Sequence, residues 1–290
     1  MATPAKLSHI AISNILLATD FSPESQNALQ CALSLARRYR TKLFLAHATP
    51  SLWVELTDLT DAKRHEGEVK MAQLESPEGL KNLPHKTIVE TGEPWQVLSH
   101  LVREENVDFV VMGTHGAGGM NKLFVGSTAE QVIRHATCPV FTVGPHVRTL
   151  VSDRFASILY ATDFSEGSMR ALDYALSFAE EDRSEMTMLH VIESTPVSES
   201  ELVEWKRQDR DKLKQMIPPD LDLAYKPEIE VEVGAAAQEI VRLADSRDTD
   251  LVVMGCHSGG AVSTHLPWTT LHHVLQHTHC PVLTVRGTLH

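Results

Sequence analysis

Several patterns that would assign this chain of 290 residues to a class at once are missing from it. Its four cysteines, Cys31, Cys138, Cys256 and Cys280, include no C-x-x-C pair and are too few for a disulfide scaffold. No run approaches the roughly 20 apolar residues that a membrane-spanning helix needs. The first residues, 1–6, lack the apolar core of a signal peptide. We therefore expect a cytoplasmic protein with free thiols and no membrane segment.

Positive charge is also scarce. Lys and Arg number 26 against 38 Asp and Glu, which gives a formal net charge of −12. A protein that binds nucleic acid by neutralising phosphates needs the opposite balance, so we expect no nucleic-acid partner. Aromatic residues make up only 6% of the chain, but apolar residues reach 42%, which is enough for a globular core.

What the chain does contain is an internal repeat. The segment Ile15–Ser22 (ILLATDFS) returns as Ile158–Ser165 (ILYATDFS), 143 residues later (158 − 15 = 143). The segment 108–113 (DFVVMG) returns as 250–255 (DLVVMG), 142 residues later (250 − 108 = 142). Collinear matches at nearly one offset indicate two copies of one domain, each of about 140 residues, an ordinary domain size.

Within the first copy, strand-like and helix-like segments alternate. Apolar, β-branched runs predict five strands, at 15–18, 42–48, 87–90, 109–112 and 140–143. The segments between the strands predict four helices. The first begins at Ser22–Pro23, and the others cover 52–74, 94–105 and 128–135. This alternation favours an α/β, doubly wound fold, a parallel sheet with helices on both faces. Ligands of such sheets bind beyond the carboxyl ends of the strands.

A glycine-rich loop is the clearest sign of function. Gly113 and Gly116 follow the strand at 109–112, and Gly126 and Ser127 precede a helix. Glycine has no Cβ, so backbone N–H groups can approach an anion closely. A helix N-terminus adds unpaired donors and partial positive charge. The loop lacks the lysine of a P-loop, but its pattern predicts a phosphate site.

These features resemble the universal stress protein family in its tandem two-domain form. The resemblance rests on the spacing G-x-x-G-x9-G-[ST] over Gly113–Ser127, on ATDFS at Ala18–Ser22 and on TCPV at Thr137–Val140. It implies two domains, 1–147 and 152–290. Each would be a Rossmann-like, adenine nucleotide alpha hydrolase-like sheet of five parallel strands in the order 3-2-1-4-5. The fifth strands would pair, here within one chain, and a homodimer is possible.

The resemblance further implies that the first half binds ATP. Ala18 and Asp20 would line the adenosine side, and Ala48 would contact the adenine. Met112 and Gly113 would lie under the ribose and phosphates. Four residues would hold the phosphates through N–H groups and hydroxyls: Gly116, Gly126, Ser127 and Thr128. Asp20 could alternatively hold a Mg²⁺ ion on the phosphates or cap the turn that follows the strand.

The second copy departs from this pattern. At the offset of 142, Ser258 replaces Gly116 and Trp268 replaces Gly126. An indole should obstruct the approach of phosphate, so we expect no ATP in this half. A smaller or differently placed ligand stays open. The segment 199–214, which carries Trp205, is predicted to be a helix that packs on its sheet or binds a partner.

The sequence offers no nucleophile–base pair, so we predict no catalytic residues. The expected output is regulatory, in a stress response, through an unidentified protein partner. Three alternatives remain: a slow ATPase, a nucleotide-independent scaffold and a binder of AMP or cyclic AMP. His273 and His277, close to Cys280, also permit a zinc site. We expect the cysteines to be packing residues, with Cys256 the more exposed.

Overall fold

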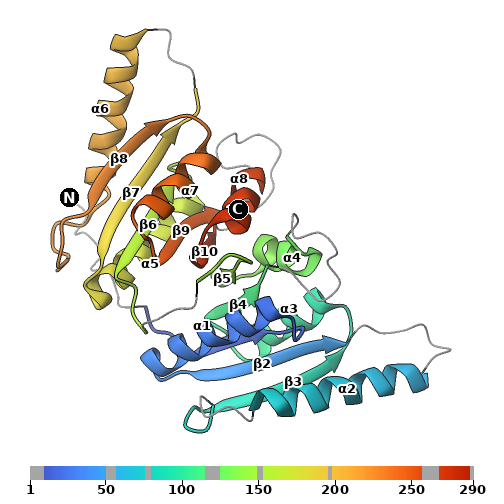
Figure 1. Cartoon of the computed structure of the whole chain (residues 1–290). Coiled ribbons are helices and arrows are strands. Elements are labelled where there is room, and N and C mark those ends of the chain that lie inside the picture. The colour runs from blue at the N-terminus through green and yellow to red at the C-terminus, as the bar shows by residue number, and fades with distance from the viewer. Residues whose placement is uncertain are drawn as a thin grey trace. The chain divides into compact units, whose positions relative to one another are not determined.

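The computed structural model describes residues 10–49, 57–75, 80–114, 125–148, 153–194, 198–256 and 268–287. The chain divides into two compact units, one of which is Ile12–Asp153 while the other contains Arg154–His290. Each half is a parallel sheet with helices on both of its faces (Figure 1). Across the described ranges, no helix is both long enough and apolar enough to cross a membrane.

The N-terminal half contains a five-stranded sheet in the order β3-β2-β1-β4-β5, and its paired strands run parallel. Its elements are β1 (Asn14–Ala18), α1 (Pro23–Tyr39), β2 (Lys42–Thr49), α2 (Thr57–Glu75), β3 (His85–Thr91), α3 (Pro94–Glu104), β4 (Phe109–Gly113), α4 (Ser127–His135) and β5 (Val140–Val143). Right-handed crossovers put α1 and α2 on one face of the sheet and α3 and α4 on the other. The predicted strand order is confirmed.

The C-terminal half repeats this arrangement in the order β8-β7-β6-β9-β10. Its elements are β6 (Ser157–Thr162), α5 (Glu166–Asp182), β7 (Glu185–Ile192), α6 (Glu199–Gln215), β8 (Glu228–Val233), α7 (Ala236–Ser246), β9 (Leu251–Cys256), α8 (Trp268–His277) and β10 (Val282–Arg286). In each half the first strand lies at the centre of the sheet, so helices cover it on both sides. That is why its sequence is an unbroken apolar run rather than an alternation.

Three of the four cysteines are part of the apolar core. All four are free, and Cys31, Cys256 and Cys280 are buried. Burial raises the pKa of the Cys31 and Cys280 thiols to about 12, which keeps both protonated at neutral pH. The expectation that Cys256 is more exposed was wrong: it forms the end of β9 and is 5% exposed.

A glycine at the end of the fourth strand in each half is required by helix packing. A Cβ on Gly255 would overlap the backbone N of Ser168 and lie 2.5 Å from the carbonyl carbon of Gly167, at the start of α5. A Cβ on Gly113 would lie 3.0 Å from the backbone carbon of Glu24, at the start of α1. The recurrence of this glycine in both copies is therefore explained without any phosphate.

Helix α8 carries a pair of stacked histidines. The rings of His273 and His277 lie 4.0 Å apart at an interplanar angle of 20°. Nδ1 of His273 is buried and has no hydrogen-bond partner in the part of the chain that the structure describes. Burial, followed by repulsion from His277 and His272, lowers the pKa of His273. Among the described side chains, no group of three His, Cys, Asp or Glu is placed to hold a metal.

The first prediction concerns the two glycines. Gly255→Ala should lower the free energy of unfolding by about 1–3 kcal/mol, because the methyl group forces apart a strand and a helix start. Gly113→Ala is the matched control and should lower the free energy of unfolding less, because the added Cβ would lie farther from its nearest neighbour. Urea denaturation of both variants measures the difference. An equal loss in the two variants would contradict the packing argument.

The second prediction concerns His273. Its folded pKa is lowered, so the unfolded chain takes up a proton at higher pH than the folded chain does. Stability should therefore decrease as the pH falls below the ordinary histidine pKa of about 6.5. His273→Phe, which keeps an aromatic ring, should reduce the loss of unfolding free energy between neutral and mildly acidic solution. His100→Phe, the same substitution at an exposed position of α3, serves as the control for the exchange of the ring itself.

Candidate functional site

A cavity of about 460 Å³ lies in the N-terminal half at the point where the strand order reverses. Ala18, the last residue of β1, pairs with Ala46 of β2 on one side and Met112 of β4 on the other. The carboxyl ends of these three strands therefore meet at one edge of the sheet, where ligands of doubly wound folds bind. The helices α3 and α4 complete the wall with Pro94, Leu98 and residues of the first turn of α4.

The structure brings together the predicted site residues that it describes. Eight of them line this cavity: Ala18, Asp20, Ala48, Met112, Gly113, Gly126, Ser127 and Thr128. The ninth, Gly116, lies outside the described residues. Their common placement was predictable because each lies at or next to the carboxyl end of a strand or the start of a helix in a parallel sheet. Their role in binding a nucleotide stays a prediction.

The start of α4 faces this cavity without a side-chain cap. Gly126 is the N-cap residue, with φ −61° and ψ 148°, and within the described part of the chain this helix start has no side-chain cap hydrogen bond. By contrast, Ser22 caps α1 and Glu93 caps α3 through side-chain oxygens. The N–H groups of Ser127 and Thr128 are therefore available to an anion in the cavity.

The turn after β1 fixes the position of Asp20. Phe21 adopts a left-handed backbone with φ 65°, and its N–H donates to Oγ1 of Thr19 at 3.1 Å. Oδ1 of Asp20 accepts from the N–H of Ser22 at 3.1 Å and from its hydroxyl at 2.6 Å. The C-terminal half repeats the turn, with Phe164 at φ 62° and Asp163 accepting from Ser165. Turn formation thus accounts for an aspartate in both copies.

The sequence analysis did not single out His47, a residue of β2 that lines the cavity and contacts this turn. Its Nδ1 lies 2.8 Å from the carbonyl oxygen of Thr19, and its ring lies 4.4 Å from the ring of Phe21. His190 makes the same two contacts with Thr162 and Phe164, at 2.8 Å and 4.4 Å. The recurrence of the histidine at the offset of 143 was a usable signal that its position is structural.

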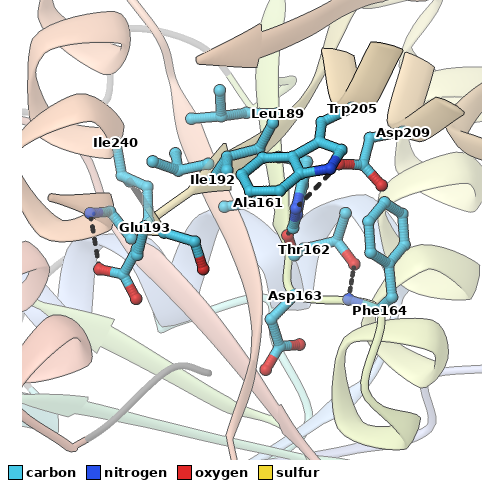
Figure 2. Close-up of a pocket in the computed structure, with 14 residues that line it drawn as sticks. Ala161, Thr162, Asp163, Phe164, Leu189, Ile192, Glu193, Trp205, Asp209 and Ile240 are labelled. Atoms are coloured by element: carbon cyan, nitrogen blue, oxygen red, sulfur yellow. Dashed lines mark hydrogen bonds and ion pairs between the residues drawn. The ribbon is translucent and has the colours of Figure 1, made fainter. Parts of the chain in front are cut away.

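The C-terminal half has a cavity of about 330 Å³ that overlaps in part with the position of the first, since Ala161 and Asp163 line it as Ala18 and Asp20 line the other (Figure 2). It lies along β7 and is bounded by α6 and by Ala236 and Ile240 of α7. Gly255, the counterpart of Gly113, is buried against the start of α5 and does not line it. The cavity is therefore displaced from the end of β9 towards α6.

Trp205 and Asp209 of α6 form a wall that has no counterpart in the first cavity (Figure 2). At the offset of 142, Asp209 corresponds to Gly67 of α2. A Cβ on Gly67 would lie 3.0 Å from the ring of His47, so α2 approaches the sheet too closely for a long side chain there. The prediction that the segment around Trp205 forms a helix is confirmed, and its contribution to a cavity was not foreseen.

The prediction that Trp268 blocks phosphate in the second half stays a prediction. Trp268 is the first residue of α8, which matches its expected place at a helix start. Its side chain and Ser258 lie outside what the structure describes.

Comparison with known proteins bears on both halves. The model of the Universal stress protein family matches residues 11–144 and 154–286. A putative universal stress protein of Staphylococcus aureus strain USA300 is 29% identical over 143 residues, which cover 46% of this chain and 85% of that protein.

Two solved structures are similar to nearly the whole chain. A universal stress protein from Archaeoglobus fulgidus has a TM-score of 0.71 at 20% identity, covering 97% of this chain and 98% of that one. A functionally unknown protein from Pseudomonas aeruginosa has a TM-score of 0.64 at 18% identity, covering 96% and 93%. These two likenesses concern the fold alone, whereas the family model matches both halves of the sequence. The chain therefore belongs to the universal stress protein family and carries two domains of that family in tandem.

Proposed function

We propose that the N-terminal half binds ATP and that the nucleotide has a regulatory rather than a catalytic effect in a stress response. One observation carries most weight: the uncapped first turn of α4 lines a cavity at the switch point of the sheet. Unpaired N–H donors at a helix N-terminus favour phosphate oxygens. The cavity also offers an apolar side for a base, formed by Ala18, Ala48 and Leu98.

The charge of the cavity is consistent with an anionic ligand that brings its own cation. Among its lining residues that the structure describes, Asp20 is the single carboxylate. One of its oxygens already accepts two hydrogen bonds from Ser22. A Mg²⁺ ion would therefore take most of its ligands from phosphate oxygens and water, with Asp20 as one protein ligand, which is how this ion commonly binds with nucleotides.

The regulatory effect is supported by how the titratable lining residues are used. Asp20 is held in the turn by Ser22, and His47 by the carbonyl oxygen of Thr19. The hydroxyl described as bonded to Asp20 is that of Ser22, which caps α1. Phosphoryl transfer would need a hydroxyl poised to attack a phosphate, in addition to charge stabilisation. The partner surface that ATP would affect, and pairing of the two halves or of two chains, remain predictions of the family resemblance.

The third prediction tests the helix start directly. Gly126→Asp should supply the missing side-chain cap and raise the free energy of unfolding by about 0.5 kcal/mol. The same carboxylate would occupy and repel the phosphate position, so ATP affinity should fall by at least about tenfold. Isothermal titration with ATP and Mg²⁺ measures the affinity. The backbone of Gly126 suits any residue, so Gly126→Ala is the matched control: it adds a Cβ without a charge and should lower the ATP affinity less than Gly126→Asp does.

Stoichiometry completes this experiment. We expect about one ATP per chain, because the second half lacks the glycine pattern. Two equivalent sites would contradict the assignment to the N-terminal half. An ATP affinity unchanged by Gly126→Asp would contradict the proposal that the start of α4 binds the phosphates. No binding at millimolar ATP would favour a nucleotide-independent scaffold. Tighter binding of AMP or cyclic AMP than of ATP would indicate another adenylyl ligand.

The fourth prediction concerns the regulatory effect. ATP should slow amide hydrogen exchange in the segment Gly113–Gly126 of the wild-type chain, because bound phosphates engage its N–H groups. The Gly126→Asp variant should show no such change under the same conditions. Unchanged exchange in wild type at saturating ATP would contradict the conformational effect. Phosphate release above background in wild type, lost in Gly126→Asp, would instead favour a slow ATPase.

A further inference from the structure

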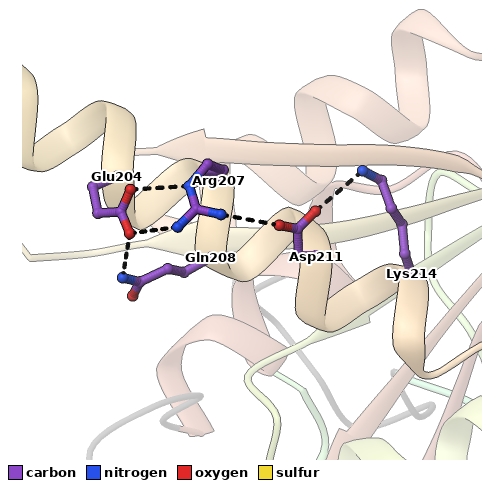
Figure 3. A network of polar contacts seen from close by, with 5 residues as sticks. All are labelled: Glu204, Arg207, Gln208, Asp211 and Lys214. Atoms are coloured by element: carbon purple, nitrogen blue, oxygen red, sulfur yellow. Dashed lines mark hydrogen bonds and ion pairs between the residues drawn. The ribbon is translucent and has the colours of Figure 1, made fainter.

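The second cavity is shaped by a helix with two different faces. The outer face of α6 carries a ladder of exposed ion pairs, Glu204–Arg207–Asp211–Lys214, joined by Gln208 (Figure 3). Hydrogen bonds from Arg207 and Gln208 lower the pKa of the Glu204 carboxyl to about 2. Charged pairs that satisfy each other in solvent add little to stability. The chemically distinctive face of α6 is therefore the inner one.

The inner face of α6 presents an indole and a carboxylate to the cavity. Trp205 and Asp209 are four residues apart, so they lie one above the other on the same side of the helix. Figure 2 shows them on one side of the cavity, with Glu193 and Ile240 opposite and Asp163 below. The walls between them are apolar, from Ala161, Leu189, Val191 and Ile192.

The described lining of this cavity carries acidic groups and no lysine or arginine. Its three carboxylates belong to Asp163, Glu193 and Asp209, whereas the described lining of the N-terminal cavity has one, that of Asp20. Nζ of Lys212 lies 3.6 Å from the centre of the ring of Phe164, which lines the cavity. The negative charge that remains disfavours phosphate and favours a positively charged ligand.

Two of these carboxylates also have structural partners. Oδ1 of Asp163 accepts hydrogen bonds from Ser165 in the turn. Oε1 of Glu193 accepts from the N–H of Ala236, the first residue of α7, at 3.0 Å. Asp209 is different because its only described polar contact is with a histidine.

His190 and Asp209 leave a gap that a donor can fill. Nδ1 of His190 lies 2.8 Å from the Thr162 carbonyl oxygen, and a carbonyl oxygen only accepts, so Nδ1 carries the proton. Nε2 lies 3.7 Å from Oδ2 of Asp209, beyond hydrogen-bond distance, with side chains that are only 15% and 24% exposed. In the neutral imidazole two acceptors thus face each other, and an N–H group between them would satisfy both.

We propose that this cavity binds an organic cation, an amine carried on a ring or a short apolar chain. The ammonium group donates to Asp209 and His190 and lies against the indole of Trp205, the aromatic ring that attracts cations most strongly. The apolar body occupies the space lined by Leu189, Ile192 and Ile240. This site is independent of the proposed ATP site, because it belongs to the other half of the chain.

The test uses three probes that share a ring and differ in charge: 2-phenylethylamine, 2-phenylethanol and 3-phenylpropionate. Isothermal titration of the full chain at low salt should show the amine binding at least about tenfold more tightly than the other two. Equal binding of the three, tighter binding of the carboxylate, or no heat with the amine at millimolar concentration would overturn the proposal.

Three variants of α6 locate the binding. Asp209→Asn removes one negative charge from the cavity and should lower the affinity for the amine by about tenfold or more. Asp211→Asn is its matched control, the same substitution two residues away on the outer face, and should bind as wild type. Trp205→Leu keeps an apolar side chain but removes the aromatic ring, so it should also lower the affinity for the amine. Equal amine affinity in Asp209→Asn and Asp211→Asn would overturn the assignment.

ATP distinguishes this proposal from the proposed function. Saturating ATP should leave the amine affinity unchanged, and Asp209→Asn should leave ATP binding unchanged. Displacement of the amine by ATP would mean that nucleotide enters the second cavity and would overturn the cation site. Loss of ATP binding in Gly126→Asp with retained amine binding would show that the two sites succeed or fail separately.

Discussion

The arrangement of each half depends on one strained turn, the left-handed phenylalanine between the first strand and the first helix. A bulky residue at positive φ costs about 1–3 kcal/mol unless its surroundings hold it. Here Thr19 binds the N–H of Phe21, Asp20 binds Ser22, and His47 links the turn to the second strand. The same turn lets Ser22 cap α1 and directs that helix across the end of the fourth strand. Helix direction, glycine requirement and cavity position all follow from it.

Duplication with divergence then separates what the fold needs from what a ligand needs. The turn aspartate and the glycine at the end of the fourth strand recur in both copies, and backbone contacts explain both. The glycine at the start of the fourth helix does not recur, because tryptophan stands at the matching position 268. The fold does not require a glycine there either, since Gly126 has an ordinary backbone conformation. A residue that the fold does not constrain is free to reflect function, which makes position 126 more informative than position 113.

Much of this was predictable from the sequence because parallel sheets impose strong local rules. Buried central strands require continuous apolar runs, and Ser22–Pro23 marks a helix start, so the parallel sheet and the rim of the first cavity could be predicted. The strand order was implied by the family resemblance. The second cavity could not. It depends on how far α6 lies from β7, and that distance is set by packing along the whole helix. The exchange of Gly67 for Asp209 was visible in the repeat, but its meaning required the distance from Gly67 to His47. Cys256 was misjudged because it extends a strand where a loop was expected.

Helices α3 and α7, the third helix of each half, are capped at their N-termini by different carboxylates. Glu93 caps α3 from its own N-cap position, whereas Ala235 cannot, and α7 instead uses Glu193 at the end of the neighbouring β7. The number of satisfied backbone donors is the same, yet the second solution moves a negative charge from the exterior to the rim of a binding cavity. Reassigning a structural hydrogen bond from one segment to another is thus a route by which a duplicated domain acquires new electrostatics while its architecture stays intact.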